Sequence, residues 1–157
     1  MNRKSMVPVD GSGDSGQVHP IAAALHRAVD AGRCPKKSVL VVDEEFLIRW
    51  ALQQDLGDRY RVWTAPSVDE ALKVLGRERI DALITDLRLP LGSGLELVKA
   101  VRAEWPRVRV FVASAAGTDD DMRRCYDYDV EAVLRKPLEV PILRGMLDFH
   151  LGQKTSP

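Results

Sequence analysis

The stretch that decides the fold is Leu83-Ile84-Thr85-Asp86-Leu87-Arg88-Leu89-Pro90, in which a short apolar run ends in a carboxylate. A loop follows that contains Pro90, Gly92 and Gly94. An apolar run of this length, closed by a loop rich in glycine and proline, is typical of a buried β-strand. The sequence therefore predicts that Asp86 lies at the carboxyl end of a buried strand.

Three further apolar runs also end in polar residues. Residues 38–42 precede Asp43 and Glu44, residues 108–113 precede Ser114, and residues 132–135 precede Lys136. Asp43 and Asp86 are 43 residues apart, about two strand–helix units, and the later steps of 28 and 22 residues are about one unit each. All strands of a parallel sheet end at the same edge, where open α/β sheets bind ligands. We therefore expect three acids, a hydroxyl and a lysine to converge on one crevice.

Strand and helix patterns alternate from residue 37 to residue 152, which we take as one domain. Strands are predicted over 38–42, 60–64, 81–85, 108–113 and 130–135. Three helices are predicted over about 45–56, 94–105 and 139–151. Two more are predicted to begin after the capping box of Ser67 and Glu70 and after Thr118. This alternation predicts a doubly wound (βα)5 sandwich, that is, a five-stranded parallel sheet with helices on both faces.

The termini read differently from this domain. Residues 1–19 are polar and contain several glycines and serines, so we predict a disordered arm, more simply a solvated tail than a partner-binding segment. A short helix is predicted over 20–31, and residues 153–157 form a C-terminal tail.

Composition excludes several classes of function. The formal net charge is zero, with 23 basic and 23 acidic residues, which argues against electrostatic binding to nucleic acid or to anionic membranes. The two cysteines, Cys34 and Cys125, lack metal-ligand spacing. No apolar run approaches the roughly 20 residues of a membrane span, and no signal core is apparent, so we expect a cytoplasmic protein.

The predicted crevice has an unbalanced charge. Asp43, Glu44 and Asp86 against the single ammonium of Lys136 leave a formal charge of −2. Mg²⁺ suits a site of a few carboxylates completed by water and phosphate oxygens. A carboxylate beside such a cation, a lysine and a hydroxyl is equipped to attack phosphorus and to hold the transferred group as an acyl phosphate.

The same motifs resemble the receiver domain of two-component response regulators. They are Val41-Val42-Asp43-Glu44-Glu45, Asp86-Leu87-Arg88-Leu89-Pro90 with Gly94-Leu95-Glu96-Leu97, Ser114-Ala115, and Lys136-Pro137. Each motif is weak alone, but all four in order at these spacings are specific. The resemblance covers about residues 37–152 and implies the strand order 2-1-3-4-5.

The resemblance also implies roles for individual residues. Asp86 is the phosphoacceptor. Glu44, Asp86 and the backbone carbonyl of Arg88 bind Mg²⁺, with Asp43 acting largely through water. The phosphoryl group is contacted by Ser114, Ala115 and Lys136, and its lifetime is tuned by Arg88 and Ala116. Val133 belongs to the switch and stands where the family usually has an aromatic residue, which predicts a weaker or differently built switch.

Three functions remain to be weighed. The leading one is a signalling module without enzyme activity beyond self-phosphorylation and self-dephosphorylation, which receives a phosphoryl group from a histidine kinase or phosphotransfer protein. We expect no second domain after residue 152 and therefore expect output by contact with an unidentified protein; a relay shuttle or phosphate sink fits equally. The second is an aspartyl-phosphate hydrolase, disfavoured because Arg88 stands where a second aspartate is wanted. The third is a binding module that is never phosphorylated, which the complete residue set disfavours.

Overall fold

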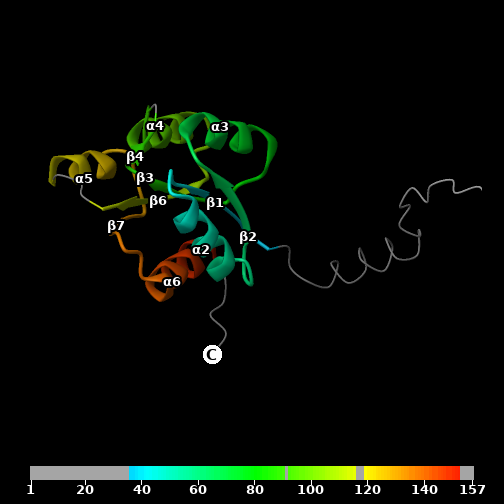
Figure 1. Cartoon of the computed structure of the whole chain (residues 1–157). Coiled ribbons are helices and arrows are strands. Elements are labelled where there is room, and N and C mark those ends of the chain that lie inside the picture. Colours follow the sequence, from blue (N-terminus) through cyan, green and yellow to red (C-terminus); the bar gives the residue numbers. More distant parts are fainter. Residues whose placement is uncertain (1–35, 91, 116–118, 153–157) are drawn as a thin grey trace, which may run out of the picture. The chain divides into compact units, whose positions relative to one another are not determined.

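The computed structural model describes residues 36–90, 92–115 and 119–152. The predicted arm, the predicted helix over 20–31, Ala116 and Thr118 lie outside these residues. A parallel five-stranded sheet runs through the domain in the order β2-β1-β3-β6-β7 (Figure 1), which confirms the expected 2-1-3-4-5 order of the main strands. Its strands are β1 Ser38–Val42, β2 Arg61–Ala65, β3 Ala82–Asp86, β6 Arg109–Ser114 and β7 Ala132–Arg135.

Helices cover both faces of this sheet, as predicted (Figure 1). On one face lie α2 (Phe46–Leu56) and α6 (Val140–Leu151). On the other lie α3 (Val68–Arg77), α4 (Gly94–Glu104) and α5 (Asp119–Tyr126). No helix in the described part of the chain has the length and apolar character needed to cross a membrane.

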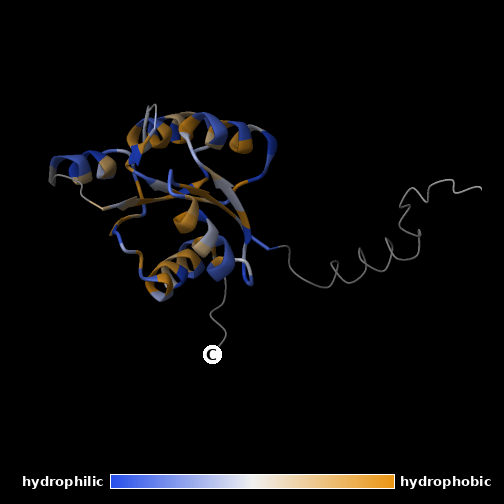
Figure 2. Cartoon of the chain, viewed as in Figure 1, coloured by the Kyte–Doolittle hydropathy of each residue, from blue (hydrophilic) through white to orange (hydrophobic). Residues whose placement is uncertain are grey.

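Continuous apolar strands follow from burial on both sides. In β1, Val39 and Val41 face the core shared with α2 and α6, whereas Leu40 and Val42 face the core shared with α3 and α4. Because side chains alternate along a strand, a strand covered on both faces needs apolar residues at every position. Figure 2 shows the result as apolar strands between helices whose polar sides face outward.

Local signals place the helices that flank the site. Ser67 accepts a hydrogen bond from Glu70 N at the start of α3. At the start of α4, Ser93 and Glu96 form a complete capping box. Such caps satisfy amide groups that have no partner within the helix. Helix α4 ends at Glu104, one residue earlier than predicted, and Trp105 is its C-cap directly before Pro106.

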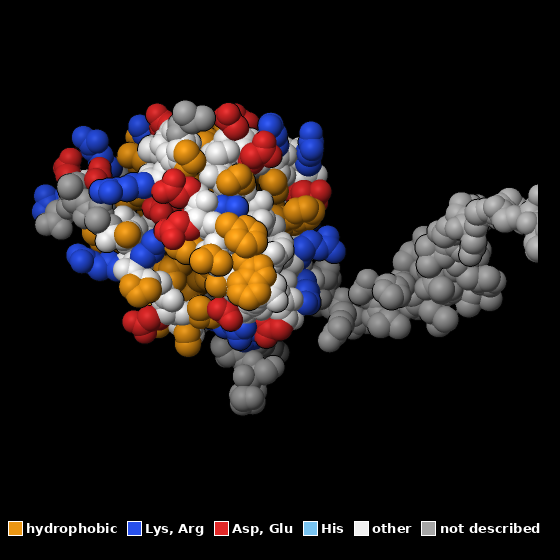
Figure 3. Space-filling view, in the orientation of Figure 1, with side chains coloured by type: hydrophobic (Ala, Val, Ile, Leu, Met, Phe, Trp, Pro, Cys, Tyr) orange, Lys and Arg blue, Asp and Glu red, His pale blue; other side chains and the backbone are white. Residues whose placement is uncertain are grey.

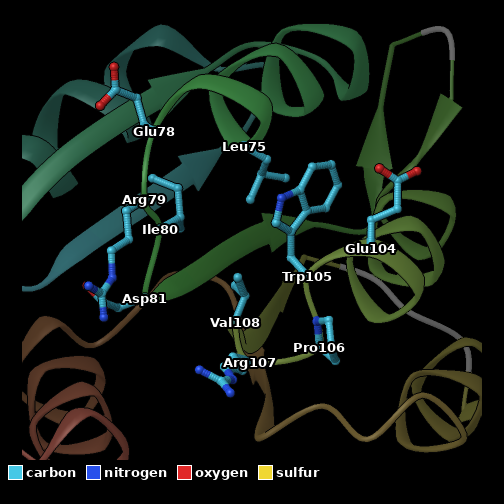
Figure 4. A pocket seen from close by; sticks show the side chains of 10 residues that line it. All are labelled: Leu75, Glu78, Arg79, Ile80, Asp81, Glu104, Trp105, Pro106, Arg107 and Val108. Atoms are coloured by element: carbon cyan, nitrogen blue, oxygen red, sulfur yellow. The ribbon is translucent and has the colours of Figure 1, made fainter.

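A cavity of about 530 Å³ lies at the amino ends of β3 and β6, at the opposite edge of the sheet from Asp86. Figure 4 shows the Trp105 ring beside Leu75 in this cavity, with charged side chains such as Glu78 and Arg79 around it. None of the predicted site residues lines it. The candidate site is therefore defined by the polar strand ends and not by this cavity.

Candidate functional site

Asp43 directly follows β1 and its side chain is turned inward. Only 3% of the residue is exposed. Its Oδ1 accepts a hydrogen bond from Glu45 N at 2.9 Å, and its backbone carbonyl accepts one from Arg49 Nη1 at 2.7 Å. These bonds hold the turn between β1 and α2, so the carboxylate is positioned before any ligand arrives.

Asp86 is the last residue of β3, and 8% of it is exposed. Its Oδ1 accepts a hydrogen bond from Arg88 N at 3.0 Å. The strand end is anchored to the neighbouring strand, because Leu87 N donates to the carbonyl of Ala113 at 3.2 Å. The second carboxylate oxygen of Asp86 points toward Lys136, which contacts it directly.

Lys136 joins the two aspartates. Its Nζ donates to Asp43 Oδ2 at 2.5 Å and also to Asp86 Oδ2. Burial by itself lowers the pKa of Lys136, but hydrogen bonds and charge attraction from both aspartates outweigh it, so the pKa lies above its usual value. The lysine is therefore a fixed positive charge at this edge of the sheet.

Ser114 ends β6 and is buried, whereas Ala115 after it is exposed. The carbonyl of Ser114 accepts a hydrogen bond from Lys136 N at 2.9 Å, which ties the β6 end to the lysine. A cavity of about 200 Å³ borders Ser114 and Arg88. The hydroxyl residue and the residue two after Asp86 thus border one space.

Glu44 does not join Asp43 and Asp86 in the buried group, although the sequence predicted that these three carboxylates would cluster. The residue is exposed, and within the described ranges no three Asp, Glu, His or Cys side chains form a metal-binding group. The physical reason is local: Asp43 is turned inward by Glu45 N and Lys136, so the next residue of the same turn faces solvent. Two carboxylates and one ammonium therefore form the buried group, with a formal charge of −1.

The donor chemistry of this group fits Mg²⁺. Mg²⁺ commonly uses one or two carboxylates and keeps several waters, so two carboxylates with a net negative charge meet its usual requirement. The side chain of Glu44 lies on the turn next to Asp43 and could supply a further oxygen.

The loop after Asp86 contains a feature that sequence reasoning missed. Residues Arg88–Leu89 (β4) and Gly92–Ser93 (β5) pair as a short antiparallel hairpin. The hairpin brings Gly94 against the site, with Gly94 N donating to the carbonyl of Leu87 at 2.9 Å. A Cβ at position 94 would lie 1.9 Å from the carbonyl oxygen of Asp86. The glycine was visible in the loop, but its contact depends on a turn that spacing alone does not define.

Val133 lies in the middle of β7, paired with Val112, and its side chain packs on the core shared with α3 and α4. The strand is only partly buried. No described aromatic side chain occupies this strand. The structure thus places a small, stiff residue at the predicted switch position.

Comparison with known proteins agrees with this architecture. The sequence model of the response regulator receiver domain family matches residues 39–148 of this chain. The KDP operon transcriptional regulatory protein KdpE of Escherichia coli is 33% identical over 120 residues, covering 76% of this chain and 53% of that protein. Sporulation initiation phosphotransferase F of Bacillus subtilis is 23% identical over 121 residues, covering 76% of this chain and 98% of that protein.

A solved structure gives the same picture. A response regulator receiver protein from Pseudomonas putida superposes with a TM-score of 0.71 at 28% identity, covering 74% of this chain and 99% of that one. The chain spans 21% of the hydrogenase transcriptional regulatory protein HoxA of Cupriavidus necator and 25% of the response regulator protein PilR of Pseudomonas aeruginosa, so it corresponds to part of these relatives. The family match covers most of the chain and confirms the resemblance read from the four motifs. This chain belongs to the receiver domain family of response regulators.

Proposed function

We propose that this chain accepts a phosphoryl group on Asp86 from a histidine kinase or histidine phosphotransfer protein, in a Mg²⁺-dependent reaction. Receiver domains are signalling domains that interact with such donors and generally bind Mg²⁺ at an acidic pocket. The observation that carries the proposal for this chain is the buried pair of Asp43 and Asp86 held by one lysine at the ligand-binding edge of the sheet.

The reaction forms one bond and breaks one. A carboxylate oxygen of Asp86 attacks the phosphorus, and the bond between phosphorus and the donor's imidazole nitrogen breaks. The electron pair of the broken bond stays on that nitrogen, and a proton on the other ring nitrogen of the donor makes the leaving group a neutral imidazole. Asp86, Glu44 and the Arg88 carbonyl would hold Mg²⁺, with Asp43 acting through water, and a bound ion would supply positive charge beside the phosphoryl oxygens.

The chain's own residues then hold the product. Lys136 supplies a positive charge beside both aspartates, and the Ser114 hydroxyl donates to a phosphoryl oxygen. Ala115, next to Ser114, offers its backbone amide. Arg88, bordering the same cavity as Ser114, controls how water reaches the phosphoryl group, together with Ala116.

The partner surface is proposed at the same edge. Phe46, Leu47 and Trp50 of α2 are between 52% and 72% exposed, and Figure 3 shows apolar side chains gathered over this helix. A cavity of about 180 Å³ beside them is lined by α2, by Lys136 and by apolar residues after it, such as Leu138. Exposed apolar side chains next to a reactive carboxylate favour a protein donor and signalling by protein–protein contact.

The experiment is a labelling reaction. The protein is incubated with Mg²⁺ and acetyl phosphate, a small phosphodonor, and its mass is measured. One added phosphoryl group is expected in wild type and none in Asp86→Asn, whereas Asp81→Asn, which changes an aspartate at the other edge of the sheet, keeps the label. Full labelling of the Asp86 variant would refute the assignment.

A second candidate is a relay, in which the phosphoryl group is passed onward from Asp86. It is favoured by the likeness to sporulation initiation phosphotransferase F, nearly all of whose length this chain matches. Mixing the phosphorylated protein with a histidine phosphotransfer protein distinguishes a relay from a terminal phosphoacceptor. A relay transfers its phosphoryl group to that protein faster than the group is hydrolysed.

A further inference from the structure

Helix α5 carries an arginine, Arg124, that lines the same cavity as Ser114 and Arg88. We propose that α5 responds to phosphorylation of Asp86 through Arg124. The Arg124 guanidinium is drawn toward the phosphoryl group on Asp86, and the helix closes on the sheet. This inference rests on the proposed phosphorylation of Asp86. It assigns the transmission of the signal to charge attraction between a phosphoryl group and α5.

The cavity lies between the strand ends and the helix. It measures about 200 Å³, with Arg88 and Ser114 on the side of the sheet and Asp121 and Arg124 on the side of α5. Because Ser114 also borders this space, a phosphoryl group held by its hydroxyl would face the helix wall. The cavity leaves room for a side chain of α5 to turn inward.

Arg124 is weakly held where it stands. Its Nε lies 3.5 Å from Asp120 Oδ2, and the two side chains are 61% and 73% exposed. An exposed i,i+4 ion pair contributes little to stability, because water screens both charges. A phosphoryl group carries nearly two negative charges and accepts paired hydrogen bonds from a guanidinium, so it competes well with Asp120.

Asp121, on the same wall as Arg124, opposes this movement. Asp121 lines the cavity beside Arg124, and its carboxylate would be repelled by a phosphoryl group, so the attraction of Arg124 must exceed this repulsion for α5 to close. Fixing a phosphoryl group by Ser114 and Lys136 tips the balance only if Arg124 is present. The arginine is therefore the residue on which the response depends.

Hydrogen bonds hold the turn that follows the carboxyl end of α5. Among the α5 side chains that are described, only Cys125 is buried. The turn after the helix is fixed, because Arg102 donates from Nε to the Tyr128 carbonyl at 2.9 Å and from Nη2 to the Asp129 carbonyl at 2.7 Å. Figure 1 shows α5 at the edge of the domain. These bonds hold the turn after the carboxyl end of α5, so a movement drawn by Arg124 would pivot about that end.

Strand β7 carries no aromatic ring that could move in response to phosphorylation. Val133 has no ring, and Tyr128 is held twice, by Arg102 at its carbonyl and by Lys99 Nζ at 5.3 Å from its ring centre. Tyr126 is 57% exposed on the last turn of α5. Arg124, in contrast, borders the cavity beside Ser114 and carries a charge opposite to that of a phosphoryl group.

The test measures hydrogen–deuterium exchange in the full chain, with and without beryllofluoride and Mg²⁺. Beryllofluoride stands in for the phosphoryl group on Asp86, and a bound ¹⁹F NMR signal reports whether it is there. In wild type, beryllofluoride is expected to slow exchange in α5 about tenfold. Arg124→Gln should abolish the slowing while keeping the bound ¹⁹F signal.

Two matched variants complete the design. Arg123→Gln removes the neighbouring exposed arginine, which does not line the cavity, and should behave as wild type. Arg124→Lys keeps the charge without the paired donors and should slow exchange by an intermediate amount. Equal slowing in Arg124→Gln and wild type, or bound beryllofluoride with unchanged α5 exchange, overturns this inference. Absence of any bound ¹⁹F signal in wild type would instead overturn the proposed phosphorylation itself.

Discussion

Gly94 lies directly against the backbone carbonyl of Asp86, so close that a methyl group at position 94 would sit 1.9 Å from the carbonyl oxygen. The contact joins the start of α4 to the last residue of β3. The two atoms nearest to such a methyl group are the carbonyl oxygen and the carbonyl carbon of Asp86. Both belong to the backbone, so neither can move without shifting the strand end. The position of the reactive carboxylate therefore depends on the absence of a side chain eight residues later.

We expect Gly94→Ala to destabilise the domain by about 1–3 kcal/mol, the usual cost of overpacking a tightly packed site. Urea unfolding measures the free energy of unfolding. Gly76→Ala is the control, because a Cβ at position 76 meets nothing within 4 Å and alanine favours a helix interior by about 1 kcal/mol. Equal stability of Gly94→Ala and wild type would show that the backbone relaxes freely there.

Lys136→Met should lower the free energy of unfolding at neutral pH by about 1–3 kcal/mol, since two buried carboxylates lose their charged donor. The folded-state pKa of Lys136 lies above its ordinary value of 10.5. The contribution of the lysine is therefore complete below that value and is lost as pH rises through the folded-state pKa. Unfolding titrations from pH 7 to pH 12 should show wild type and variant converging only in the alkaline range. A gap that stays constant with pH argues against the charge as its source.

Mg²⁺ binding should depend on the acids of the turn after β1. We expect Glu44→Gln and Asp43→Asn each to weaken Mg²⁺ binding about tenfold or more, equivalent to at least about 1.4 kcal/mol. Tryptophan fluorescence is a suitable signal, because half-exposed Trp50 lies on the helix that follows this turn. Glu45→Gln is the matched control on the neighbouring exposed residue and should bind as wild type. Wild-type affinity in Glu44→Gln would remove Glu44 from the metal site.

Tyr60 and Asp148 form a buried polar contact between the residue before β2 and α6. The Tyr60 hydroxyl donates to Asp148 Oδ1, and Arg59 Nη1 lies 3.0 Å from Asp148 Oδ2. Tyr60→Phe should cost about 1–3 kcal/mol, because Asp148, only 3% exposed, loses a donor.

The same contact predicts alkaline sensitivity. Burial, followed by the hydrogen bond and the negative charge of Asp148, raises the pKa of Tyr60 above its ordinary value of 10.0. A raised folded-state pKa stabilises the fold below pH 10 and this stabilisation fades as pH rises further. Thermal unfolding between pH 8 and pH 12 should therefore show a steeper alkaline loss in wild type than in Tyr60→Phe. Parallel curves would contradict the assignment.

The order of the elements could be predicted from the sequence because the sheet is covered on both faces. Runs such as residues 38–42 are apolar at every position, and each ends in a polar residue. Boundaries moved slightly: β2 is Arg61–Ala65 and β3 is Ala82–Asp86, each one residue later than predicted. The four motifs in their order were enough to indicate the family, which the comparison confirmed.

Tertiary structure alone decided how the site residues face one another. Sequence spacing places Asp43, Asp86 and Lys136 at one edge, but it does not state that one ammonium serves both carboxylates while Glu44 faces solvent. It also does not reveal that Gly94 touches Asp86 or that Arg124 borders the cavity beside Ser114. Strand periodicity defines which side of the sheet a residue occupies, because side chains alternate strictly along a strand. The direction of a side chain in a turn depends on hydrogen bonds to residues far away in the chain, and only the folded structure brings those residues together.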